Sequence, residues 1–160
     1  MDKEEIFDRL NQCRKALLDT LDKLSEDELD SARVEGSWTV KEILCHLTAW
    51  ELTVLDPLVG YVQVDQFKPD IIDDHDAWNA EQTTMRKAWS VQQVIDELQS
   101  TREMLVSEAS LLSDEQWDRI LPAPWGGQGC IANLLNGLVW HENEHLQTIQ
   151  NWHQRQIHAN

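Results

Sequence analysis

Apolar residues recur every three or four positions in four long segments of the chain. This spacing is typical of helices that bury one face, so it predicts four long amphipathic helices. A shorter stretch with the same spacing predicts one further helical segment over residues 77–89. The long helices are expected over residues 2–24, from Ser37 or Thr39 to near residue 58, over 90–112 and over 131–157.

Polar residues at three of the predicted helix starts have the spacing of a capping box. In a capping box the side chains of the N-cap residue and of the residue three positions later both bond to the helix backbone. Pro57 and Gly60 predict that the second helix kinks or ends near them, and residues 61–75 are expected to form a long crossover. The three pairs are Asp2 with Glu5, Thr39 with Glu42 and Ser90 with Gln93.

Two short segments of the chain resemble each other. Residues 24–30 read LSEDELD and residues 112–118 read LSDEQWD, and each segment follows a long helix and precedes a loop that contains a tryptophan. The chain therefore reads as two helical hairpins joined by the crossover. Two such hairpins bury their apolar faces best against each other, which predicts an all-α four-helix bundle that forms a single domain over residues 1–160.

Composition narrows the class of protein. A chain of 160 residues has the size of one domain, and its six glycines and four prolines are too few for a fold of many short strands. The net charge of −16 argues against binding to nucleic acids or anionic membranes. No apolar run of about 18 residues predicts a membrane span. Three cysteines without CxxC spacing, and an acidic start unlike a signal peptide, predict a cytoplasmic setting.

The strongest chemical signal lies in the last predicted helix. His141 and His145 are four residues apart, so they lie on one helix face and have the spacing of two ligands of one metal ion. That face also carries leucines, and it includes Glu142. Buried imidazoles and a carboxylate need partners, which a divalent cation supplies. Glu142 is then expected to act as a general base if it reaches a metal-bound water. The alternative is that these are ordinary, partly exposed polar residues of a helix.

The segment 141–145 (HENEH) matches the HExxH pattern of zinc proteases, but the protease interpretation fails. Such enzymes draw a third ligand from well downstream, and only fifteen residues follow His145. The third ligand must therefore lie upstream. His46, at the border of the apolar face of the second helix, is the best candidate, and His75 is an alternative in a predicted loop. His153 and His158 are expected to be solvated.

The residues around His46 resemble a known family. The segment 37–51 (SWTVKEILCHLTAWE), the element Asp76–Asn79 (DAWN), and the pair His141 and His145 are similar in order and spacing to the DinB/YfiT-like superfamily. The resemblance implies an up-down-down-up four-helix bundle with a long crossover between its second and third helices. It also implies a divalent metal held by His46, His141 and His145, with Zn²⁺ or Ni²⁺ as the expected ion.

Relatives in that superfamily include thiol-dependent S-transferases, maleylpyruvate isomerase and a cyclopropane hydrolase. The resemblance therefore implies a metal-dependent enzyme, a thiol S-transferase or a hydrolase, that acts on a small electrophilic molecule with or without a low-molecular-weight thiol. It also implies a homodimer. Two alternatives stay open at this point: a protein that binds or sequesters a small molecule without turnover, and a structural bundle whose histidines are vestigial.

Overall fold

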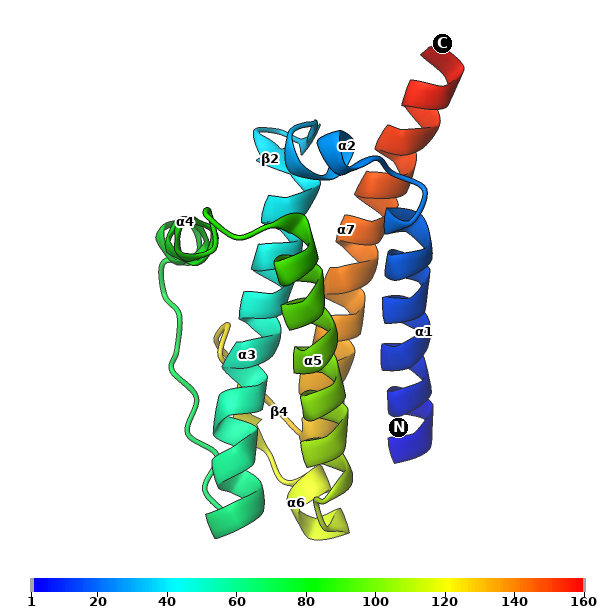
Figure 1. Cartoon of the computed structure of the whole chain (residues 1–160). Coiled ribbons are helices and arrows are strands. Elements are labelled where there is room, and N and C mark those ends of the chain that lie inside the picture. The colour runs from blue at the N-terminus through cyan, green and yellow to red at the C-terminus, as the bar shows by residue number, and fades with distance from the viewer. Residues whose placement is uncertain (1, 160) are drawn as a thin grey trace.

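Four long helices form the bundle in the computed structural model, which describes residues 2–159 (Figure 1). The helices α1 and α7 run in one direction, and α3 and α5 run in the opposite direction, so the connectivity is up-down-down-up. α3 packs most extensively against α5, and α1 packs most extensively against α7. The predicted all-α four-helix bundle is confirmed. The bounds are Lys3–Leu21 for α1, Val40–Val64 for α3, Val91–Ser110 for α5 and Ile131–Ala159 for α7.

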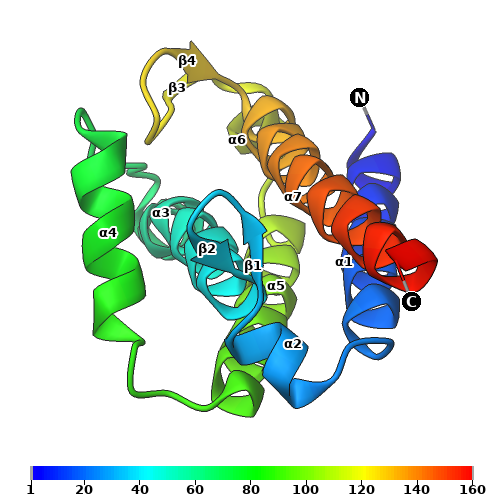
Figure 2. The ribbon, with the colours of Figure 1, turned by 90° about the horizontal axis from the view of Figure 1, so that it is seen from above.

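Short elements connect the long helices. A five-residue helix and a small antiparallel hairpin precede α3, and the same pair of elements precedes α7. A further helix, α4, lies outside the bundle and packs on α3 (Figure 2). The bounds are Glu26–Asp30 for α2, Arg33–Glu35 for β1, Trp38–Thr39 for β2, His75–Met85 for α4, Asp114–Asp118 for α6, Leu121–Pro122 for β3 and Gln128–Gly129 for β4.

Capping boxes begin four of the helices. The predicted boxes at Thr39 and Ser90 are formed, and two more begin the short helices α2 and α6. The box predicted at Asp2 is wrong, because the Asp2 side chain makes no capping hydrogen bond. The four pairs are Ser25 with Glu28, Thr39 with Glu42, Ser90 with Gln93 and Ser113 with Gln116.

Helix α3 is longer than the sequence predicted. It continues through Pro57 and Gly60 to Val64, and Asp65 ends it in the left-handed conformation with φ of 57°. A proline inside a helix costs about 3 kcal/mol, but the buried side chains of Leu58 and Tyr61 hold this last part of the helix in the core. The non-helical crossover is correspondingly shorter than predicted and covers residues 65–74.

Among the described residues, α3 is the one helix that is long and apolar enough to cross a membrane by length and composition. In this fold, 67% of its most apolar window is buried inside the bundle. Burial against α5 therefore accounts for its apolar character, as for the core helix of a bundle. The absence of a membrane partner stays a prediction.

The similarity between residues 24–30 and 112–118 extends to the whole of the two hairpins. Residues 88 positions apart are equivalent in α1 and α5, and residues 91 positions apart are equivalent in α3 and α7. The helix directions in Figure 1 agree with a twofold axis perpendicular to the bundle, because α1 and α5 run in opposite directions and so do α3 and α7. Equivalent buried pairs include Ile6 and Val94, Leu10 and Leu98, Arg14 and Arg102, Leu17 and Leu105, Leu44 and Leu135, Glu51 and Glu142, and Leu58 and Ile149.

Candidate metal centre

Three histidines from two helices converge on one point. His46 comes from α3, and His141 and His145 come from successive turns of α7. The Nε2 atom of His141 lies 2.7 Å from Nε2 of His46 and 3.2 Å from Nε2 of His145. One ligand atom from each residue thus lies within 4.8 Å of the other two. The structure brings together the three residues that the sequence named as metal ligands.

The hydrogen bond at Nδ1 of His46 determines the tautomer of the ring and thus the form of the Nε2 atom that faces the cluster. Oδ1 of Asn79 lies 3.0 Å from Nδ1 of His46 and also accepts the indole N–H of Trp50 at 3.0 Å. An indole nitrogen only donates, so the atom that faces it is an acceptor. Nδ1 of His46 must therefore donate its proton to Asn79. In the neutral ring, Nε2 of His46 then presents a lone pair to the cluster.

A carboxylate orients His145 in the same way. Oε2 of Glu35, on strand β1, lies 2.8 Å from Nδ1 of His145. An ionised carboxylate accepts hydrogen bonds only, so Nδ1 of His145 is the donor and its Nε2 faces the cluster. An acceptor on the far nitrogen fixes the tautomer and the ring orientation of a metal-ligating histidine. Glu35 and Asn79 supply this acceptor for two of the three rings.

The donor set fits a divalent metal ion. Nε2 of His141 carries at most one hydrogen and can donate it to one neighbour only, so with neutral rings and no cation at least one of its two short N···N contacts would lack a hydrogen bond. For metal–nitrogen distances of about 2.0–2.1 Å, ligand nitrogens lie roughly 3 Å apart. The two separations from Nε2 of His141, 2.7 and 3.2 Å, are close to that value. Three imidazoles suit Zn²⁺ or Ni²⁺ and leave coordination positions for water or substrate.

Burial keeps two of the rings neutral. Desolvation, together with the neighbouring imidazoles, lowers the pKa of His46 to about 3. Desolvation and the nearby His145 lower the pKa of His141 to about 4. Neutral imidazole is the form that binds a metal ion. The cluster is therefore in its metal-binding form at these two residues throughout the physiological pH range.

Lowering the pH from about 6.5 to about 4 is expected to destabilise the metal-free fold through these residues. In the unfolded chain an imidazole has a pKa of about 6.5 and takes up a proton across this range, whereas His46 and His141 stay neutral in the fold. The unfolded state then binds more protons, so the free energy of unfolding falls as the pH falls. Urea unfolding in a chelator at pH 7 and pH 5 checks this. The double variant His46→Gln, His141→Gln should lose less stability between the two pH values, and an equal loss would contradict the prediction.

A cavity of about 320 Å³ opens beside the histidines. Its walls are mainly aromatic and aliphatic, and its polar lining comes from imidazoles and one amide. Trp50 and Trp140 both line it, whereas Trp152 of the same helix as Trp140 lies outside the lining and packs, half-buried, against the core. The lining residues are His46, Trp50, His75, Asn79, Trp125, Gly137, Leu138, Trp140 and His141.

The remaining histidines lie outside the cluster. His75, the alternative third ligand, lines the cavity at the first residue of α4 and packs on Trp50 with ring centroids 5.1 Å apart. The expectation that His153 is solvated is wrong, because the residue is half-buried and its Nδ1 atom is buried without a hydrogen-bond partner. His158 is exposed as expected.

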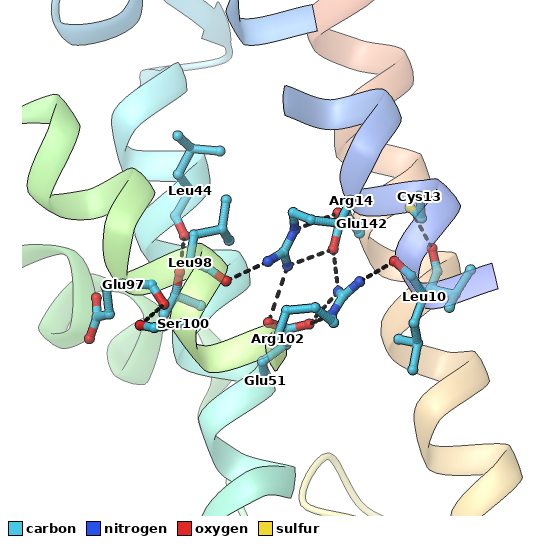
Figure 3. A network of polar contacts seen from close by, with 12 residues as sticks. Leu10, Cys13, Arg14, Leu44, Glu51, Glu97, Leu98, Ser100, Arg102 and Glu142 are labelled. Atoms are coloured by element: carbon cyan, nitrogen blue, oxygen red, sulfur yellow. Dashed lines mark hydrogen bonds and ion pairs between the residues drawn. The ribbon is translucent and has the colours of Figure 1, made fainter. Parts of the chain in front are cut away.

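Glu142 takes part in a buried ion-pair network. Its side chain is 1% exposed, and its two oxygens accept hydrogen bonds from Arg14 at 3.0 and 2.9 Å and from Arg102 at 2.5 Å (Figure 3). Burial alone would raise the pKa of Glu142, but the two guanidinium groups hold it below its usual value. A carboxylate held by two arginines is a poor proton acceptor. This environment argues against the expected role of Glu142 as a general base.

The network joins all four long helices. Glu51 of α3 bonds to the same two arginines, at 3.1 Å from Nη2 of Arg14 and through Nε of Arg102. Arg14 donates to the backbone carbonyl of Leu98, and Arg102 donates to that of Leu10. Each bond in one half thus has its equivalent in the other half, and the two positive and two negative charges balance. This network was not predicted from the sequence.

Comparisons with known proteins find relatives that are described as metal-dependent hydrolases. "Putative metal-dependent hydrolase OB0413" of Oceanobacillus iheyensis is 26% identical over 150 residues, which are 92% of this chain and 84% of that one. YfiT from Bacillus subtilis, described as "a probable metal-dependent hydrolase with an unusual four-helix bundle topology", is 19% identical, with a TM-score of 0.75 over 96% of this chain and 87% of that one.

A larger enzyme shares the fold. The mycothiol-dependent maleylpyruvate isomerase is 11% identical with a TM-score of 0.78, and the match covers 93% of this chain but only 61% of the isomerase. At such identities the two solved structures show the fold alone. The profile of the DinB superfamily matches residues 9–149, from the first long helix to the last. Because that match spans most of the sequence, the chain belongs to the DinB superfamily.

Proposed function

We propose that this protein is a metal-dependent enzyme that acts on a small electrophilic molecule, either by hydrolysis or by transfer of a thiol. The observation that carries the proposal is the convergence of three Nε2 atoms at the edge of an apolar cavity. A divalent ion there would act as a Lewis acid and lower the pKa of a bound water or thiol. The name of the Oceanobacillus relative favours hydrolysis, whereas the mycothiol-dependent neighbour favours a thiol.

The residues of the chain have separate tasks in this proposal. Asn79 and Glu35 hold the histidine rings in the tautomer that binds metal. The tryptophans wall the cavity and exclude water from the reacting group. His75, which lines the cavity outside the histidine cluster, offers a hydrogen bond to a bound molecule. We also propose a cytoplasmic homodimer that uses a small-molecule substrate and, given the charge of −16, neither nucleic acid nor membrane.

Protein purified without a histidine tag is expected to contain one Zn²⁺ or Ni²⁺ per chain. Metal analysis measures the content, and the same sample is then tested on two reactions. One is hydrolysis of p-nitrophenyl acetate, and the other is consumption of 1-chloro-2,4-dinitrobenzene in the presence of a small thiol. We expect the metal-loaded protein to accelerate at least one reaction, and chelation or His46→Ala to remove that acceleration.

Two outcomes would contradict the proposal. Rates equal to those of the chelated sample in both reactions, with metal bound, would favour a protein that binds a small molecule without turnover. Failure to bind either metal would favour a structural bundle.

A further inference from the structure

We infer that the cavity beside the histidines binds an uncharged, planar apolar ring against the indoles of Trp50 and Trp125, which places an attached electrophilic group at the metal. This inference rests on the proposed function for the metal, but the binding of the ring is a property of the protein alone. The observation behind it is an asymmetry between the two otherwise equivalent halves of the bundle.

The twofold relation matches two histidines of the metal site with two other residues that line the same cavity. His46 of α3 is equivalent to Gly137 of α7, and His141 of α7 is equivalent to Trp50 of α3, since both pairs are 91 positions apart. All four residues line the cavity beside the histidines. The twofold axis therefore passes through this region, with ligating side chains on one side and an indole and a glycine on the other.

The tryptophan of each hairpin packs differently in the two halves. Trp38, before α3, packs edge-to-face on the imidazole of His46 with ring centroids 4.9 Å apart. Trp125, between the strands of the hairpin before α7, packs against the backbone of Gly137, where an added Cβ would lie 3.1 Å from its ring. The Trp125 ring therefore takes the space that a side chain at Gly137 would occupy, and it lines the cavity together with Trp50, with ring centroids 6.5 Å apart. The wall beside the ligating histidines is thus aromatic, and an apolar ligand ring packs on it.

The residues that line the cavity disfavour a charged ligand. Among residues 2–159, no carboxylate, lysine or arginine lines the cavity, so a charged group on the ring would lose its hydration without gaining a partner. Anions are disfavoured further by the net charge of −16 and by Asp73, Asp74 and Asp76, which flank the cavity residue His75 in the sequence. A volume of about 320 Å³ accommodates one substituted ring, at the small end of the usual range for ligand pockets.

Three probes that share one ring test the inference in metal-free protein: benzamide, benzoate and benzamidine. Binding is followed by tryptophan fluorescence and by the indole N–H signals in NMR spectra. We expect benzamide to bind at least about 10-fold more tightly than benzoate, and also more tightly than benzamidine. Benzoate and benzamidine carry a charge whose hydration is lost on burial, whereas benzamide is neutral. The indole signals of Trp50 and Trp125 should shift.

Two variants locate the binding. Trp125→Ala removes one wall and should abolish the benzamide shifts, and Gly137→Ala should weaken binding because its Cβ forces the Trp125 ring to move. Alanine favours a helix over glycine, so the second variant is expected to fold. Gln147→Ala, at an exposed position of the same helix, is the control. Benzoate binding equal to benzamide, or benzamide binding unchanged in Trp125→Ala, would overturn the inference.

Zinc titration of the same variants separates this inference from the proposed function. Gly137→Ala and Trp125→Ala should bind Zn²⁺ as wild type does, because neither residue belongs to the histidine cluster. Loss of benzamide binding with zinc binding intact assigns the ring site to the tryptophans. Benzamide binding in a protein that takes up no zinc would support the ring site and refute the metal.

Discussion

Replacing Arg102 by methionine is expected to lower the free energy of unfolding by about 3–5 kcal/mol, the usual cost of breaking a buried ion pair from one side. The substitution keeps most of the side-chain volume but leaves Glu51 and Glu142 sharing one guanidinium in the core. A loss of this size lowers the melting temperature by roughly 6–20 °C for a chain of this length. Urea unfolding and calorimetry measure both quantities.

The twofold relation makes this prediction more specific. Arg14 occupies the equivalent position and makes the equivalent bonds, so Arg14→Met should cost the same as Arg102→Met to within about 1 kcal/mol. The control is Lys15→Met, which removes the exposed pair with Asp19 and should cost about 0–1 kcal/mol. An Arg102→Met protein within 1 kcal/mol of wild type would show that the network does not hold the helices together.

The signal for this network was present in the sequence. Arg14 lies between Leu10 and Leu17 on the apolar face of its helix, and Arg102 lies between Leu98 and Leu105 in the same way. A charged residue in the middle of an apolar face needs a buried partner of opposite charge. The separation of 88 positions, already visible in the two acidic segments, relates the two arginines. Helical periodicity alone does not predict which glutamates bind the two arginines, because ion pairs across the bundle depend on which helices are neighbours.

The candidate metal ligands could be predicted because local geometry carries most of the signal. His141 and His145 share a helix face by their spacing, and His46 lies at the edge of another apolar face. The residues that orient them could not be predicted in this way. Asn79 is brought to His46 by the docking of α4, and Glu35 is brought to His145 by the first hairpin. Such contacts depend on tertiary packing, which residue periodicity does not encode.

Replacing His46 by alanine is expected to reduce the affinity for Zn²⁺ by more than the roughly 10–100-fold that loss of an outer partner costs. Two ligands remain on α7, but only the fold brings in the third. Asn79→Ala and Glu35→Ala, which remove outer partners only, should fall within that range. His75→Ala, in the cavity but outside the cluster, should bind as wild type does. Isothermal titration under identical buffer conditions gives all four affinities.

Thermal stability supplies an independent measure of the same site. An ion that binds only the folded state stabilises it by mass action, by about 2.7 kcal/mol at a free concentration 100 times the Kd. Wild type and His75→Ala should therefore melt at a higher temperature when Zn²⁺ is added, and His46→Ala should not. A His46→Ala protein that binds zinc as tightly as wild type, with the same rise in melting temperature, would show that the ion binds elsewhere. Because His46 is the one ligand supplied by α3, this substitution tests whether the two helices close a single site.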